Sequence, residues 1–223
     1  MINFIVHGFA FLHLFKQYAM NSFQLTIGRF IMGLKRPSRS TNRRRLREWG
    51  ETLESFTIRE VTDQDLLPLV DLHVQTWADT YWTVKQPPTH ETRERQWREV
   101  FKQQDGSWCC FVVQNRAGKL IGFAHGVHYS HPDMPGFEGE LSKIYLLLEY
   151  QRLGLGRLLI GHIARKFLGQ GIRSMLCFGV PQNPSNRFYE TLHGERLYDK
   201  KGDFHGGYGW KDLEKLAAIC PID

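Results

Sequence analysis

The sequence has no long apolar run. No stretch of 18 or more uncharged apolar residues occurs among its 223 residues, so it offers no candidate for a membrane-spanning helix. The apolar stretch from Met1 to Phe15 is interrupted by His7 and His13. It also lacks the basic start and the small-residue cleavage site of a secretory signal. We therefore expect a cytoplasmic protein.

Cysteine is scarce, and none of the four cysteines has metal-ligand spacing: Cys109, Cys110, Cys177 and Cys220. The histidines form no recognisable ligand pattern either. No local sequence supplies a histidine partner for a nucleophilic cysteine. We expect reduced cysteines that act as packing groups, and no metal.

Acidic residues are absent from residues 1–47, which contain nine lysines and arginines. The formal net charge is +6, but the rest of the chain holds 20 basic and 23 acidic residues. The positive charge therefore belongs to a leader, which we place at residues 1–53. It is either disordered or a mis-assigned start, with Met20 and Met32 as alternative first residues. A solvated tail and a surface for nucleic acid are the two interpretations of its charge; nucleic-acid binding by the rest of the chain is not expected.

After the leader, the hydrophobic pattern predicts a domain of class α/β (α+β) over residues 54–215. Predicted strands span 56–61, 108–114, 119–129, 137–148, 172–180, 195–200 and 204–211. Predicted helices span 66–79, 91–103, 154–169 and 183–192, with Thr89 as an N-cap. The strand–helix–strand unit within 138–180 requires one parallel crossover. We predict a mixed, mostly antiparallel six- to seven-stranded sheet with helices on both faces, followed by a tail at residues 216–223.

The segment from Gln151 to Arg157 leads from a predicted strand into a helix whose start contains Gly154 and Gly156. The first N–H groups of a helix lack internal partners and favour anions. A Walker loop needs Gly-Lys-Ser/Thr, which is absent, and a dinucleotide fingerprint needs a third glycine where Leu159 stands. The segment therefore predicts a pyrophosphate site of another kind.

This segment, together with the stretch from Asn183 to Gly194, resembles the GNAT superfamily of N-acetyltransferases. Gln151-Arg152-Leu153-Gly154-Leu155-Gly156 matches that superfamily's Gln/Arg-x-x-Gly-x-Gly loop. Asn183-Pro-Ser-Asn-Arg-Phe-Tyr-Glu-Thr-Leu-His-Gly194 is similar to its second motif. The resemblance covers about residues 56–211. It departs from the pattern at Leu148, Asn186 and Glu195, and none of these changes removes the phosphate loop.

The resemblance implies acetyl-CoA as co-substrate and a set of residues that bind it. The backbone of Ile144, Tyr145 and Leu146 would pair with the pantetheine arm. The pyrophosphate would lie on the loop made by Gln151, Arg152, Leu153, Gly154, Leu155, Gly156 and Arg157. Asn183 would either hold the cofactor arm or cap a helix.

The resemblance also implies the catalytic groups. Tyr189 would give a proton to the departing thiolate, or else it is a core tyrosine. Glu140 would withdraw the amine proton, because burial raises the pKa of a carboxyl group; alternatively it binds a cationic substrate or pairs with Lys143. By strand alternation, Glu138, Ser142 and Ile144 are expected on its face.

Trp77, Tyr81 and Glu138 are the predicted acceptor-binding residues. The aromatic pair would suit an amine, or it belongs to the core. The predicted function is transfer of an acetyl group to a primary amine of a small molecule or peptide. A non-catalytic acyl-CoA sensor on the same fold is the alternative. The acceptor, the length of the acyl group and whether the chain forms a homodimer stay open.

Overall fold

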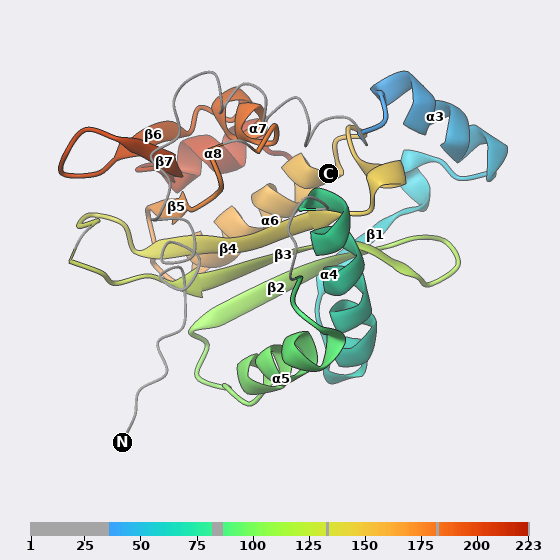
Figure 1. The fold of residues 1–223 in the computed structure, drawn as a ribbon, viewed down its shortest axis with the longest axis horizontal. Coiled ribbons are helices and arrows are strands. Elements are labelled where there is room, and N and C mark those ends of the chain that lie inside the picture. Colours follow the sequence, from blue (N-terminus) through green and yellow to red (C-terminus); the bar gives the residue numbers. More distant parts are fainter. Residues whose placement is uncertain (1–35, 82–86, 133, 182, 223) are drawn as a thin grey trace.

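The computed structural model describes residues 36–81, 87–132, 134–181 and 183–222. Seven of their strands form one sheet in the order β1-β2-β3-β4-β5-β7-β6 (Figure 1). The strands are β1 (Thr57–Glu60), β2 (Trp108–Gln114), β3 (Leu120–His128), β4 (Gly139–Leu146), β5 (Met175–Cys177), β6 (Glu195–Tyr198) and β7 (Phe204–Trp210). Among these described strands, only β4 and β5 pair in parallel. The predicted mixed, mostly antiparallel sheet is confirmed.

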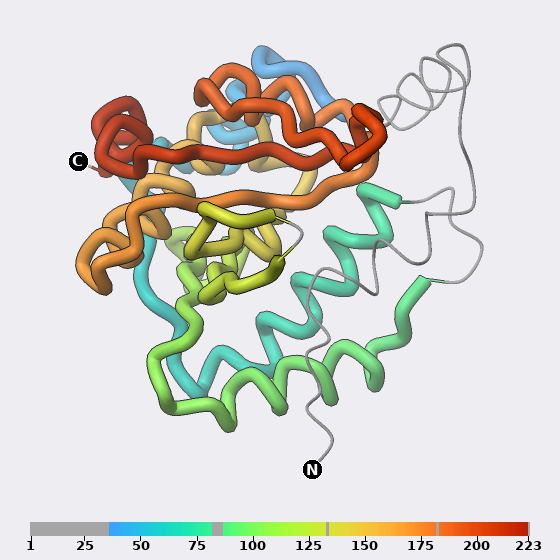
Figure 2. Tube along the Cα trace, turned by 90° about the vertical axis from the view of Figure 1, so that its left-hand side faces the viewer, coloured from blue at the N-terminus to red at the C-terminus, as the bar shows by residue number. Residues whose placement is uncertain are grey.

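Helices cover both faces of this sheet, as Figures 1 and 2 show together. The pair α4 and α5 lies against one face, and α6 lies against the other with α8 beside it. The helices are α3 (Arg39–Glu48), α4 (Leu66–Thr80), α5 (His90–Phe101), α6 (Leu155–Gly169), α7 (Asn186–Thr191) and α8 (Leu213–Ile219), with single 3₁₀ turns η1 (Leu53–Ser55), η2 (Asp63–Asp65) and η3 (Leu148–Tyr150). None of the helices in the described ranges is of a length and hydropathy that could bridge a bilayer.

An aromatic cluster joins α4 and α5 to the sheet. Thr89 starts α5 as predicted, because its hydroxyl oxygen accepts the N–H of Thr92 at 3.2 Å. The ring of Trp97 on α5 then packs 5.7 Å from that of Phe123 on β3, and its indole N–H donates to Nδ1 of His73 on α4 at 3.1 Å. Each such buried aromatic contributes about 1.5–3 kcal/mol. This cluster fixes the two helices above the middle of β3 and β4.

The predicted leader and tail boundaries both fall inside packed structure. The described part of the leader contains α3, whose N-cap Ser38 accepts the N–H of Thr41, and Leu46 of this helix is 4% exposed in the core. At the other end, α8 runs across residue 216 and buries Leu213 and Leu216. The packed domain thus begins before residue 54 and extends past residue 215. Residues 1–35 lie outside the described part of the chain, so the prediction for them stays a prediction.

Candidate active site

A β-bulge in β4 decides which side chains share the site. Lys143 of β4 pairs with His125 and Leu141 pairs with Gly126, so Ser142 is an extra residue without a partner on β3. An extra residue reverses the alternation of faces. Glu140 therefore shares its face with Lys143 and Tyr145. The prediction that Ser142 and Ile144 lie on the face of Glu140 was wrong for this reason.

The edge of β4 that faces β5 is open over most of its length. The two strands pair only at Gly139 with Met175 and at Glu140 with Leu176. Beyond Glu140, β4 continues to Leu146 with β3 as its partner strand. The predicted pantetheine-binding residues Ile144, Tyr145 and Leu146 lie on this open stretch. An extended ligand can pair with such an edge as an added strand would.

The predicted phosphate loop lies where β4 leads into α6. Gly154 caps α6 with a φ of 99°, a conformation that favours glycine, and Arg152 also has a positive φ of 62°. Among the described residues, none accepts a hydrogen bond from the backbone N–H groups of residues 152–156. Gly156 faces Phe188 of α7, where an added Cβ would lie 3.3 Å from the ring. The loop thus offers a row of unpartnered N–H groups at the positive end of a helix.

Buried leucines of the loop itself and a neighbouring helix hold this loop in place. Leu153 and Leu155 are buried beneath it. Asn42 of α3 is fully buried and donates its amide N–H groups to the carbonyl oxygens of Leu148 at 2.8 Å and Gln151 at 2.9 Å. Helix α3 is therefore part of the support of the site, which the sequence did not suggest.

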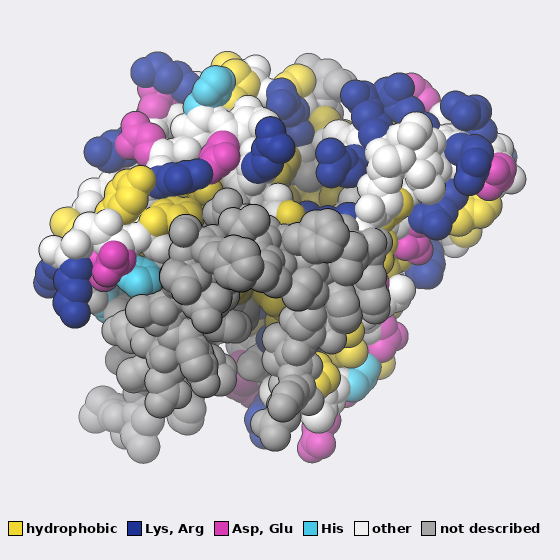
Figure 3. All heavy atoms as spheres, turned by 45° about the horizontal axis from the view of Figure 1, so that its top comes forward, with side chains coloured by type: hydrophobic (Ala, Val, Ile, Leu, Met, Phe, Trp, Pro, Cys, Tyr) yellow, Lys and Arg dark blue, Asp and Glu magenta, His cyan; other side chains and the backbone are white. Residues whose placement is uncertain are grey.

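Polar and charged side chains around the loop have different roles from one another. Gln151 donates to the carbonyl oxygen of Leu146 at 2.9 Å, which ties the loop to the end of β4. Arg157 donates to the carbonyl oxygen of Ile219 at 3.1 Å and so holds α8. Arg152 is exposed. Dark-blue Lys and Arg side chains gather over α3 in Figure 3. The surface around the loop is basic.

Glu140, which is buried, and Lys143, which is half-buried, are groups of opposite charge on the sheet face below α4 and α5. Glu140 is 4% exposed, and burial raises its pKa to about 7, while the positive charge of Lys143 acts in the other direction. Burial lowers the pKa of Lys143 to about 8, and Glu140 opposes this. The ammonium group of Lys143 also lies 5.5 Å from the Trp97 ring centroid. Near neutral pH, Glu140 can therefore accept and release a proton.

Tyrosine side chains from three elements meet beside this pair. Trp77 and Tyr81 form a small cluster with Val180, and Tyr145 packs against it. Burial raises the pKa of Tyr81, while hydrogen bonds with Tyr145 and Asn183 oppose the change. Burial likewise raises the pKa of Tyr189 well above its usual value, and the nearby Cys177 and Tyr81 add to this. The structure thus brings together Trp77, Tyr81, Tyr145 and Tyr189 from distant parts of the sequence.

The side chains of Asn183 and Glu138 accept hydrogen bonds from other parts of the chain. The Asn183 side-chain oxygen accepts the N–H of Ser185 at 2.9 Å, a turn that precedes α7, and also accepts from Arg36 at 3.2 Å. Glu138 is exposed and accepts the N–H of Arg173 at 2.6 Å. It lies just before β4 begins, and the structure does not bring it to the tyrosine cluster.

Sequence reasoning missed two arginines at this site. Arg36 donates to Asn183 and, at 2.8 Å, to the hydroxyl of Ser185, and its charge acts on both Tyr81 and Tyr189. Arg93 lies on α5, where its charge acts on Tyr145 and Tyr81. A signal for Arg93 was present, since it precedes Trp97 by four residues and so lies on the buried face of its helix.

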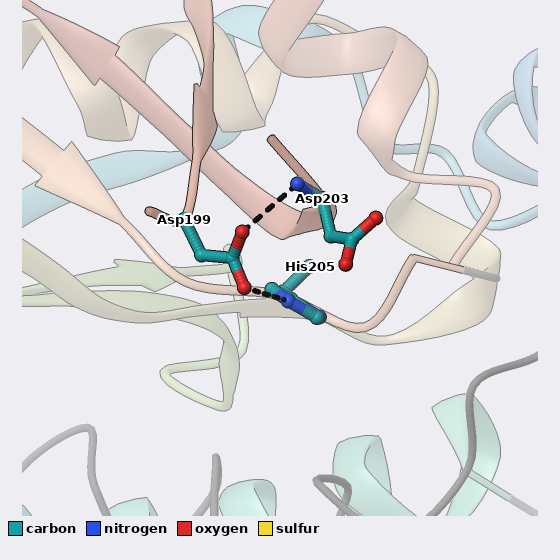
Figure 4. Close-up of side chains that lie close together, drawn as sticks. All are labelled: Asp199, Asp203 and His205. Atoms are coloured by element: carbon teal, nitrogen blue, oxygen red, sulfur yellow. Dashed lines mark hydrogen bonds and ion pairs between the residues drawn. The ribbon is translucent and has the colours of Figure 1, made fainter. Parts of the chain in front are cut away.

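Other clusters and hollows lie away from this site. Asp199, Asp203 and His205 come together at the hairpin between β6 and β7 (Figure 4). Asp199 there accepts the N–H of Asp203 at 2.9 Å and hydrogen-bonds His205 at 3.0 Å, so these contacts organise the turn. One hollow of about 340 Å³ adjoins Arg173 and Glu214, and one of about 480 Å³ adjoins Asp63 and Arg98. Strand pairing, rather than these hollows, locates the site.

Comparison with known proteins agrees with this geometry. The sequence profile described as "Acetyltransferase (GNAT) family" matches residues 72–194, more than half of the chain. The chain belongs to the GNAT family of acetyltransferases. It is 31% identical over 170 residues to the uncharacterized N-acetyltransferase YuaI of Bacillus subtilis (strain 168), covering 73% of this chain and 97% of that protein. It is 26% identical over 164 residues to phosphinothricin N-acetyltransferase of Streptomyces viridochromogenes, with 70% and 83% covered.

The fold of this GNAT chain is also that of solved structures. The PaiA N-acetyltransferase from Thermoplasma acidophilum, determined in complex with coenzyme A, superimposes with a TM-score of 0.57 at 20% identity. The match covers 70% of this chain and 98% of that one. The GNAT fold predicted from the two sequence motifs is confirmed. The predicted site residues, a homodimer and a cytoplasmic location stay predictions.

Proposed function

We propose that this chain transfers the acetyl group of acetyl-CoA directly to a primary amine of a small molecule or peptide. The main support for this proposal is the position of Glu140. Its pKa is raised to about 7, and it shares a sheet face with Tyr145 beside the open edge of β4. The row of unpartnered N–H groups at residues 152–156 lies at the end of the same strand. A thioester cofactor bound along this edge would therefore lie beside a proton acceptor on the same strand.

The open edge and the loop suit coenzyme A. The pyrophosphate would lie on the N–H groups of residues 152–156, and the pantetheine amides would pair with the backbone of residues 144–146. When bound, acetyl-CoA supplies the activated acyl group. The basic surface around Arg152 adds favourable charge for the phosphates.

Residues of this chain would act at three points in the transfer. Glu140 takes a proton from the acceptor ammonium group, leaving a neutral amine whose nitrogen forms a bond to the thioester carbonyl carbon. The tetrahedral oxyanion would be held by a backbone N–H in the stretch 144–146. The carbon–sulfur bond then breaks, and Tyr189 gives its phenolic proton to the thiolate. The nitrogen loses its second proton, which restores the Tyr189 phenol by way of solvent, and Glu140 releases its proton to solvent as the amide and the free thiol leave.

The test is an amine panel with acetyl-CoA, measured by thiol release. We expect turnover with at least one amine and an activity that rises with pH through about 7, as Glu140 loses its proton. Glu140→Gln should lose most of the turnover and the rise with pH, whereas the exposed Glu195→Gln should keep both. Calorimetric binding of acetyl-CoA without turnover of any amine would favour the acyl-CoA sensor instead.

A further inference from the structure

Arg93 is half-buried, and its guanidinium group has a buried hydrogen-bond donor that is not used. Its Nε–H is buried and has no hydrogen-bond partner among the described residues. Another nitrogen of the same group donates to the side-chain oxygen of Gln96 at 2.9 Å, and that partner is neutral. No carboxylate of the described residues forms an ion pair with Arg93. A buried donor without a partner is costly, so this arrangement is typical of a site that a ligand completes.

A second unused donor lies beside it. Trp77 is 7% exposed, and its indole Nε1–H is also buried without a partner among the described residues. The Arg93 guanidinium carbon lies 5.9 Å from the centroid of the Trp77 ring. Both groups can only donate, never accept. What satisfies them must therefore present acceptor oxygens, and the guanidinium favours acceptors that carry negative charge.

The balance of charge around the predicted catalytic groups also favours a ligand that carries negative charge. Arg93 acts electrostatically on Lys143 and Tyr145, which share the sheet face of Glu140. Arg36 adds a positive charge whose hydrogen-bond acceptors, Asn183 and Ser185, are neutral. Arg36, Arg93 and Lys143 thus place three basic groups around the tyrosine cluster, where Glu140 is the carboxyl group that Lys143 acts on. A polyamine would add more positive charge here, whereas an acceptor with its own anionic group would offset it.

We propose that the acceptor is an amine that also carries a carboxylate, and that Arg93 and the Trp77 indole N–H bind this carboxylate while the amine faces Glu140. This inference rests on the acetyl transfer proposed above. The substrate class is then that of amino acids and short peptides with a free carboxylate near the amine. Polyamines and amines without an acidic group are excluded as good acceptors.

The experiment compares each of several amino acids with its own carboxamide, which keeps the amine and removes the negative charge. For the unaltered protein we expect kcat/KM to be about tenfold to a hundredfold higher for the acid, the range of a charge-assisted hydrogen bond. Arg93→Gln should abolish this preference, mainly through KM of the acid. Arg93→Lys should keep part of it, and Trp77→Phe should reduce it while keeping the aromatic ring.

Arg95→Gln is the matched control, because Arg95 is an exposed residue on the same helix. It should keep the full preference for the acid. Circular dichroism melting of each variant separates loss of recognition from loss of folding, and a folded Trp77→Phe tests the proposal even where Arg93→Gln does not fold.

Direct titration of the same acid and carboxamide into the protein saturated with coenzyme A separates this inference from the proposed function. Tighter binding of the acid that depends on Arg93 supports the carboxylate site, even if no thiol is released and acetyl transfer is refuted. Turnover of carboxamides or polyamines at rates equal to or above those of the acids overturns the carboxylate site while acetyl transfer stands. An unchanged acid preference in folded Arg93→Gln also overturns it.

Discussion

Replacing Glu140 by glutamine should stabilise the protein at neutral pH while removing its activity. Glu140 is 4% exposed on β4, and burial raises its pKa from 4.5 to about 7. A pKa shift of this size lowers the free energy of unfolding by about 3 kcal/mol at pH values above 7. In the variant, Lys143 loses its opposite charge, which offsets part of the gain. We expect a net stabilisation of about 1–3 kcal/mol at about pH 8.

The dependence on pH has a definite sign. Between pH 4.5 and about 7, the folded protein holds a proton on Glu140 that the unfolded chain has released. The free energy of unfolding contributed by this group therefore falls as pH rises through that range. Glutamine does not titrate, so the advantage of Glu140→Gln is small near pH 4.5, grows with pH and levels off above about 7.

Urea denaturation of both proteins at several pH values from about 5 to 8 measures this difference directly. Subtracting the two curves removes the contribution of the other titrating groups that the proteins share. Glu195→Gln serves as the control, because Glu195 is exposed on β6 and should give a difference that stays constant with pH. A stability gain that does not change with pH would refute the reasoning about the buried carboxyl group.

Three further substitutions test the support of the cofactor and the leaving group. Asn42→Ala removes two hydrogen bonds to the phosphate loop, at 2.8 and 2.9 Å, so we expect a loss of about 2 kcal/mol in urea unfolding and weaker calorimetric binding of coenzyme A. Gly154→Ala forces a side chain into a φ of 99°, which should cost about 1–2 kcal/mol and weaken coenzyme A binding; unchanged affinity would contradict the loop geometry. Tyr189→Phe should lower kcat about a hundredfold with little change in melting temperature, and full turnover would exclude its role as an acid.

The sequence predicted the strands and helices between residues 56 and 211 because each has a clear period and clear ends. The crossover from β4 through α6 to β5 followed from the order of elements alone. Helices α3 and α8 were missed, although Ser38 and Asp212 are good N-caps that accept the N–H groups of Thr41 and Lys215. The many arginines of α3 suggested a solvated tail. Only two residues of this helix, Asn42 and Leu46, are buried, which is too weak a pattern to indicate a packed helix.

The candidate site was harder to predict, because it depends on pairing between strands. Strand alternation placed Glu140 with Ser142, and a single extra residue in β4 placed it with Lys143 instead. The bulge reflects how β4 matches β3, which no local pattern in β4 records. The bulge matters for the chemistry of the site. The carboxyl group of Glu140 lies on the sheet face covered by α4 and α5, together with Lys143 of β4 and Arg93 of α5, rather than on the face covered by α6. The proposed acceptor specificity therefore depends on one extra residue in the pairing of β4 with β3. Deleting Ser142 should turn Glu140 away from Lys143, and we expect a protein that has lost turnover but still binds coenzyme A.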